Sequence, residues 1–171
     1  ASYNLGGKIL KSIDQERDLG VVINKNLKVT EQCIIAASKA NQVLGMIRRN
    51  IKFKSKEIIV SLYKALVRPR LEYCIQAWCP NLLKDTELLE TIQRRATKMV
   101  IGLRQISYDK RLKETGLTTL VDRMERGDLI ETFKIIKGID KVDFRTWFTI
   151  YNSKRVRGHT FKLVKNHCKS N

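Results

Sequence analysis

Basic side chains gather in three stretches of this 171-residue chain, and their types suit the binding of phosphate. Arginine can hold a phosphate group with two parallel hydrogen bonds or stack on a base, whereas lysine acts as a point charge. Two stretches lie in the interior of the sequence, and the third, from Lys154 to Lys169, contains no acidic residue. The candidate nucleic-acid contacts are Arg48, Arg49, Lys52, Lys54, Arg68, Arg94, Arg95, Lys98 and Arg157.

The charge balance supports the same interpretation. Lys and Arg total 34 against 17 Asp and Glu, which gives a formal net charge of +17. A charge of this size predicts a polyanionic partner, although long basic side chains can also simply cover apolar helix surface. No apolar stretch approaches the roughly 20 residues of a membrane-spanning helix, and no signal-peptide pattern opens the chain. We therefore expect RNA or an RNA–DNA hybrid as partner, no membrane, and an intracellular location, nuclear or cytoplasmic.

The residues that would make the chain an enzyme are not found in the sequence. No two aspartates are adjacent, so the paired carboxylates that bind metal ions in phosphoryl transfer are missing. There is no nucleophile elbow, Walker loop or His-Glu-x-x-His helix. The close cysteine pair, Cys74 and Cys79, falls on a predicted helix where side chains five residues apart diverge, and no second pair accompanies it. We expect reduced, mostly buried thiols, no catalytic residue, and no metal or cofactor in this chain.

Periodicity predicts a mainly α fold, a helical bundle with a small N-terminal β element and an irregular or short-strand basic C-terminus. The predicted strands are residues 3–5, 8–13, 19–23 and 160–164. The predicted helices are residues 30–49, 55–78, 86–101, 107–114 and 119–137. This organisation gives a β element at 1–25, a helical domain at 26–138 and a basic, aromatic-containing segment at 139–171.

Local signals refine these helices. Thr30, Ser55 and Asp85 are expected as N-caps, and Gly102 as the stop of the third helix. Pro69 is expected to kink or break the second helix near Val67 and Arg68, because proline removes a backbone donor and clashes with the preceding turn.

Two groups of side chains leave alternatives open. Tyr63, Tyr73 and Trp78 lie on the apolar side of the second helix and are expected in the core, whereas Phe53, between two lysines, could touch a base or sugar. The mixed charges from Asp122 to Asp128 indicate either a solvated helix face or buried arginine–carboxylate pairs.

Several short motifs occur in a fixed order along the chain. They are Asp18-Leu19-Gly20-Val21, Arg68-Pro69-Arg70-Leu71-Glu72-Tyr73, Gln93-Arg94-Arg95-Ala96, Arg126-Gly127-Asp128-Leu129 and Arg157-Gly158-His159. Together they resemble the region downstream of the catalytic palm in reverse transcriptases of jockey-like, LINE-type non-LTR retrotransposons. Each motif alone is weak, and the resemblance rests on their order and spacing over nearly the whole chain.

The resemblance implies that the helices form a thumb that lies against a template–primer duplex. It also implies that Leu19 and Gly20 belong to the strand element that follows the palm, close to the primer end. The parent protein would be an RNA-directed DNA polymerase whose palm binds Mg²⁺ and is a partner of this chain. With an N-terminal residue Ala1 and a strand expected at Tyr3, the sequence is expected to be a fragment.

Two rivals to a nucleic-acid-binding fragment remain at this stage. One is a remnant of a truncated element that acts as a protein-interaction module through apolar faces made for the palm. The other is a polymerase activity restored when the chain joins a separate palm that supplies paired carboxylates and Mg²⁺.

Overall fold

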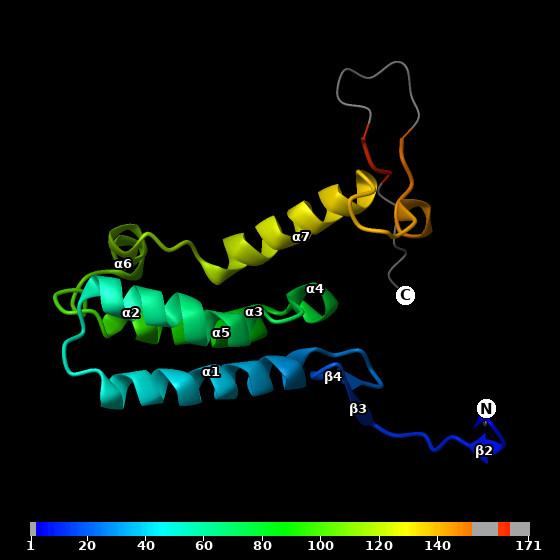
Figure 1. Ribbon diagram of the computed structural model, residues 1–171, viewed down its shortest axis with the longest axis horizontal. Helices are drawn as coiled ribbons and strands as arrows, with labels where there is room; N and C mark the ends of the chain where they lie inside the picture. The colour runs from blue at the N-terminus through cyan, green and yellow to red at the C-terminus, as the bar shows by residue number, and fades with distance from the viewer. Residues whose placement is uncertain (1–2, 152–160, 165–171) are drawn as a thin grey trace. The chain divides into compact units, whose positions relative to one another are not determined.

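The computed structural model describes residues 3–151 and 161–164, and the chain splits into two compact units (Figure 1). The first unit is Ala1–Met124 and the second is Glu125–Asn171. The described residues are mainly helical, with two small antiparallel hairpins near the N-terminus. The predicted fold class is therefore confirmed.

The hairpins come first in the chain and the helices follow. The strands are β1 (Asn4–Leu5), β2 (Lys8–Ile9), β3 (Gln15–Asp18) and β4 (Val21–Asn24). The helices of the first unit are α1 (Thr30–Asn50), α2 (Lys56–Leu62), the π-helical η1 (Tyr63–Val67), α3 (Arg68–Glu72), α4 (Ile75–Trp78), α5 (Leu83–Lys98) and α6 (Tyr108–Thr115). The long helix α7 (Leu120–Ile136) begins in the first unit and continues in the second, where the 3-10 helix η2 (Phe144–Thr146) follows it.

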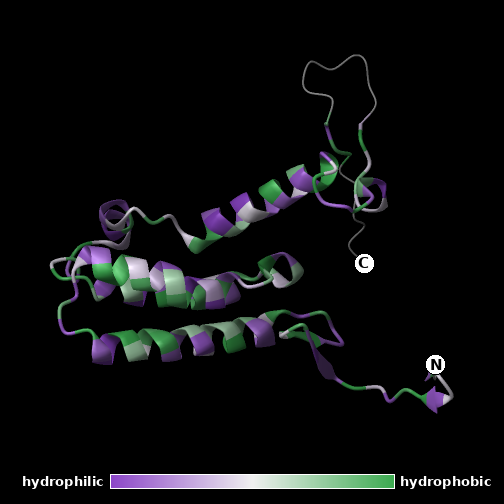
Figure 2. Cartoon of the chain, in the orientation of Figure 1, coloured by the Kyte–Doolittle hydropathy of each residue, from purple (hydrophilic) through white to green (hydrophobic). Residues whose placement is uncertain are grey.

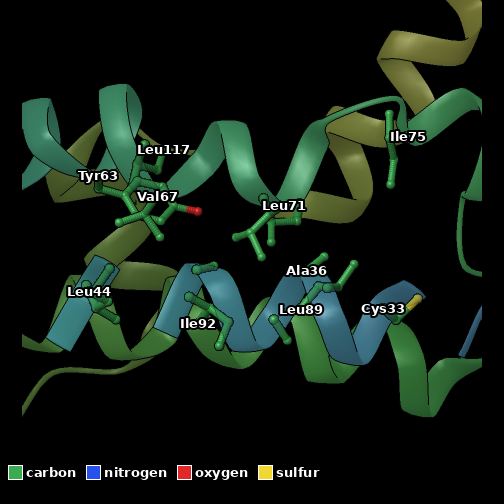
Figure 3. Packing of buried hydrophobic residues seen from close by; sticks show 14 of the residues in the cluster. Cys33, Ala36, Leu44, Tyr63, Val67, Leu71, Ile75, Leu89, Ile92 and Leu117 are labelled. Atoms are coloured by element: carbon green, nitrogen blue, oxygen red, sulfur yellow. The ribbon is translucent and has the colours of Figure 1, made fainter. Parts of the chain in front are cut away.

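The hydrophobic core lies where α1 packs against α5, η1 and α3. Small residues of α1, Ala36, Ala37 and Ala40, are buried there and allow a close approach of the helices. Figure 3 shows Ala36 and Leu71 facing each other across the α1–α3 interface. In Figure 2 hydrophobic and hydrophilic residues alternate along α1, as an amphipathic helix requires. Leu89 on α5 is fully buried, so its truncation to alanine would cost about 2–5 kcal/mol.

The prediction of a strand across Leu19 and Gly20 is wrong. These residues form the turn between β3 and β4, with φ of 45° and 87°, which matches the two positive φ values of a type I′ hairpin turn. The first strand of this hairpin is the largely charged stretch Gln15–Asp18, which is not among the predicted strands. All four of its residues are exposed, so it has no apolar alternation to reveal it.

The second predicted helix continues past Pro69 without a break, as α2, η1 and α3 from Lys56 to Glu72, but its π-helical turn ends at Val67, where the kink or break was expected. Ser55 is its N-cap, with its Oγ accepting a hydrogen bond from the Ile58 N–H at 3.4 Å. The break itself comes after Glu72, at Cys74, which adopts a left-handed conformation with φ of 52°. A π-helical turn is one of the known causes of a helix bend.

Two predicted N-caps are wrong. Helix α5 begins at Leu83, three residues before the expected start, so Asp85 lies inside its first turn. The Asp85 side chain is buried and accepts a hydrogen bond from the Thr30 Oγ1 at 2.7 Å, which joins the starts of α1 and α5. Neither Thr30 nor Asp85 caps a helix, and their side chains bind each other instead. Helix α5 also ends at Lys98, so Gly102 does not stop it directly.

Some expected core positions are exposed. Tyr73 was expected in the core but is 55% exposed, and on α1 the apolar side chain of Ile34 is 47% exposed. Tyr63 and Trp78 are buried, as expected.

The second unit contains the rest of α7, with a β-bridge between Ile150 and Leu163. Gly138 follows α7 with φ of 67°, the left-handed conformation expected after a helix end. Within this unit Lys137 Nζ lies 4.1 Å from the centre of the Phe161 ring. Residues 154–160 and 165–169 of the basic tract, including Arg157, lie outside the described residues.

Candidate nucleic-acid interface

Two of the three basic stretches converge on one open groove of about 840 Å³ in the first unit. We call it the basic groove. It lies between the C-terminal half of α1, the connection to α2, and the end of α5 with the turn that follows. Its basic lining residues are Arg48, Lys54, Arg95, Lys98 and Arg104. Arg48 and Arg95 are 47 positions apart in the sequence, so only the packing of α1 on α5 brings them together.

Two contacts fix the walls of the basic groove. The Ile101 N–H donates to the Lys54 carbonyl oxygen at 3.0 Å, which ties the turn after α5 to the α1–α2 connection. Arg95 Nη1 donates to Asn41 Oδ1 at 3.1 Å, which links α5 to α1. Asn41 was not predicted as a site residue. Asn41 lies four residues after Ala37 and three before Leu44, which are both buried on α1. This spacing places it on the same helix face as those residues and was the signal available in the sequence.

The basic groove presents uncompensated positive charge. No aspartate or glutamate lines it, and none of its basic side chains forms an ion pair with the described residues. Arg48 and Arg95, together with Lys98, lie in or near the last turns of their helices, where cations are favoured by the helix dipole. The dipole explains why cations are tolerated at each helix end. It does not explain why two such ends share one groove.

Arg94 has a different environment from its neighbour Arg95. It does not line the basic groove, and its guanidinium carbon lies 4.3 Å from the centre of the Tyr108 ring. The buried Arg111 approaches the same ring at 5.4 Å and donates from Nε to Thr97 Oγ1 at 3.1 Å. Tyr108 thus contacts two arginines, and the cation–π contact from Arg94 stabilises the packing of α6 against α5.

Gln93 is fully buried and joins several segments of the first unit. Its Oε1 accepts from the Tyr63 hydroxyl at 2.7 Å, and its Nε2 donates to the Tyr108 hydroxyl and the Thr118 carbonyl oxygen, both at 2.9 Å. The adjacent buried carboxylate of Glu90 accepts from the Leu120 N–H at 2.8 Å and from the Tyr108 hydroxyl. Burial raises the pKa of Tyr63 and of Tyr108. In the motif Gln93 to Ala96, then, the glutamine is a core residue.

Arg68 also lies away from the basic groove, in an ion-pair cluster. Its Nε is 3.8 Å from Glu72 Oε2, while Arg123 donates to both oxygens of the same carboxylate at 2.6 and 3.0 Å. The Glu72 hydrogen bond raises the pKa of Arg123. The charged residues from Asp122 to Asp128 were interpreted either as a solvated helix face or as buried arginine–carboxylate pairs. Arg123 fits the second interpretation, because it pairs with the half-buried Glu72, 51 positions earlier.

The remaining predicted residues are scattered. Arg49 and Lys52 are exposed but do not line the basic groove, and Phe53 is 68% exposed beside Lys54. Leu19 and Gly20 line a second groove of about 430 Å³, which we call the hairpin groove. Its other polar lining residues include Arg17, Lys39, Arg70 and Tyr73. The Tyr73 hydroxyl donates to the Leu19 carbonyl oxygen at 3.0 Å, so two of the sequence motifs meet there.

The described residues contain no group of three or more His, Cys, Asp or Glu side chains placed to hold a metal ion. Cys33 is buried, whereas Cys74 is exposed, which corrects the expectation of buried thiols at that position. Burial raises the pKa of the Cys33 thiol to about 12. None of the helices in the described ranges has the length and apolar character needed to cross a membrane.

Comparisons of the chain with protein-family models, curated proteins and solved structures find no match.

Proposed function

We propose that this chain is the thumb-like, nucleic-acid-binding part of an RNA-directed DNA polymerase of the LINE-type retrotransposon class, and that it grips the backbone of a template–primer hybrid. The observation that supports it most is the basic groove, where cations from two distant stretches converge without ion pairs among the described residues. The ordered motifs and the net charge of +17 support it independently.

In this proposal the chain binds the duplex by electrostatic attraction and recognises the shape of its backbone. Arg48, Lys54, Arg95, Lys98 and Arg104 offer donors and charge to phosphates along one side of a duplex. Phosphate contacts position a protein on nucleic acid without reading sequence, which suits a polymerase that must follow any template. The A-like geometry of an RNA–DNA hybrid would be selected by the spacing of these cations rather than by base edges.

In this proposal the chain performs no phosphoryl transfer itself. The sequence contains no adjacent aspartates, so the Mg²⁺ ions and their carboxylate ligands belong to a palm domain that acts as its partner. Exposed apolar side chains on the N-terminal hairpin, Leu5 and Ile9, suit a strand region that packs against further structure. The proposed location is nuclear or cytoplasmic, where element RNA and its copy are found.

The test is the affinity of groove variants for a labelled RNA–DNA hybrid, measured by fluorescence anisotropy. Arg95→Ala and Lys98→Ala each remove one phosphate contact, so each should weaken binding and reduce the slope of log affinity against log salt by about 1. Lys64→Ala is the matched control, because Lys64 is exposed and does not line the basic groove.

Equal losses in Lys64→Ala and Arg95→Ala would contradict a localised grip and would indicate diffuse attraction by the whole surface. Salt-insensitive self-association without nucleic-acid binding would instead favour the protein-interaction module.

A further inference from the structure

The basic groove has an apolar face that a phosphate grip alone does not require. Leu44, Met99, Val100 and Ile101 line it beside the cations. Ile101 is 59% exposed, although a surface built only for phosphate would gain nothing from an exposed isoleucine beside its cations. Residues that combine an apolar surface with positive charge suit a ligand that has both an apolar face and a negative charge, as a nucleotide does.

The size of the basic groove points the same way. Its volume of about 840 Å³ falls within the range of roughly 300–1,000 Å³ that is typical of clefts that bind small ligands. The backbone of a paired duplex presents phosphates and sugars, while its bases are stacked inside and hidden from a side groove. Only an unpaired nucleotide can present a base face to Met99 and Ile101 while its phosphates meet the rim.

The positions of the cations fit this arrangement. Arg95 is held toward α1 by its 3.1 Å hydrogen bond to Asn41, so its guanidinium is partly oriented before a ligand arrives. Arg48 and Lys98 come from the two helices that border the groove. The lining contains no aromatic side chain, so a base would rest on aliphatic side chains, which contact every base equally well.

We propose that the basic groove holds an unpaired nucleotide of a single-stranded segment next to the paired hybrid, with its base against Met99 and Ile101 and its phosphates on Arg95 and Lys98. This inference rests on the proposed function, because it assigns a specific ligand to the same groove. It predicts that the protein prefers a hybrid with a single-stranded extension to a blunt one.

The experiment compares three labelled hybrids of equal paired length by fluorescence anisotropy at fixed salt. One is blunt, one carries a short single-stranded overhang, and one carries the same overhang with abasic sugars. The abasic overhang keeps the added phosphates and removes the bases. We expect the natural overhang to bind about fivefold more tightly than the abasic one, the effect of burying roughly 40 Å² of apolar surface between the base and the aliphatic side chains.

Two variants locate the contact. Ile101→Ser should remove the advantage of the natural over the abasic overhang, and the protein should still fold because the Ile101 side chain is exposed. Leu83→Ser is the matched control, since Leu83 is 74% exposed and lies outside the groove. Its overhang preference should equal that of the natural chain.

Failure of the two proposals would look different. Equal affinity for natural and abasic overhangs, with blunt hybrid still bound, overturns the nucleotide site and leaves the backbone grip standing. An overhang preference that survives Ile101→Ser also overturns the site. Absence of binding to all three hybrids at low salt overturns the backbone grip and the nucleotide site together.

Discussion

A single buried amide, Gln93, connects η1, α6 and the segment before α7 to α5. Buried polar groups of this kind are costly when they lose their partners, because the protein interior offers no water to replace them. The Tyr63 hydroxyl and the Thr118 carbonyl both depend on Gln93, so its role is to fix α5 against η1, α6 and the segment before α7.

The variant Gln93→Leu should therefore unfold more easily by about 2–4 kcal/mol, since it leaves more than one buried polar group without a partner. Urea denaturation followed by circular dichroism measures the loss. Gln76→Leu is the control, because Gln76 is exposed on α4, and it should change the free energy of unfolding by less than about 0.5 kcal/mol. A Gln93→Leu protein as stable as this control would contradict the network.

Cysteine reactivity offers a second test at the residue scale. Cys33 is buried and its pKa is raised to about 12, so almost no thiolate exists near neutral pH, whereas Cys74 is exposed. A maleimide pulse read by peptide mass mapping should modify Cys74 within minutes and Cys33 only after urea is added. Rapid modification of Cys33 in the folded chain would contradict its burial in the core.

A comparison of predicted and observed helices, caps and turns shows how much of the fold the sequence alone predicts. The helices α6 and α7 match the predicted spans closely, because long periodic stretches with clear end signals determine their own structure. Thr30 and Asp85 carried good local capping signals, yet a tertiary hydrogen bond between them prevailed. The turn at Leu19 was hidden because every residue of strand β3 is exposed and three of the four are charged.

The candidate site was also predictable only in part, because tertiary packing decides which basic side chains share a groove. Arg48, Lys54, Arg95 and Lys98 were expected as contacts from residue type, and the structure brings them to one groove. The separation of Arg94 from Arg95 could not be read from the sequence, because it depends on a ring that Tyr108 supplies from another helix. The pairing of Arg68 with Glu72 and Arg123 likewise arises from packing.

The ion pair between Arg123 and Glu72 gives a prediction at the scale of elements, since it joins the start of α7 to α3. Arg123→Met keeps a long apolar side chain but removes both hydrogen bonds to the half-buried carboxylate. We expect it to lower the free energy of unfolding by about 1–2 kcal/mol. Thermal denaturation should show a melting temperature lower by about 2–8 °C.

Arg126→Met, one helical turn further along α7, is the matched control because the described residues give Arg126 no ion pair. A loss of the same size in both variants would indicate a general effect of charge removal rather than the ion pair.

At the scale of the whole molecule, stability should fall in alkaline solution. Cys33, Tyr63 and Tyr108 all have raised pKa values in the folded state, so the folded chain holds these protons more tightly than the unfolded chain. The contribution of Cys33 is fully present below the ordinary thiol pKa of 9.0 and is lost as pH rises toward about 12. The contribution of the two tyrosines is fully present below their ordinary pKa of 10.0 and is lost only above it. Urea midpoints measured from pH 8 to 11 should decline with increasing steepness above pH 9.

Cys33→Ala isolates one part of this dependence, because lysines also titrate in the same range. The variant should show a shallower decline than the natural chain, measured as the difference between the two curves. Parallel curves would contradict a raised thiol pKa in the folded state.

The net charge of +17 and the basic groove lead to the same central claim, that the molecule holds nucleic acid through its phosphates. The most direct measurement is the affinity of the natural chain for a labelled RNA–DNA hybrid across a salt series. If about five groove cations contact phosphate, the affinity should fall by orders of magnitude between about 50 and 200 mM salt. Affinity that does not change with salt, or no binding at the lowest salt, would contradict the claim.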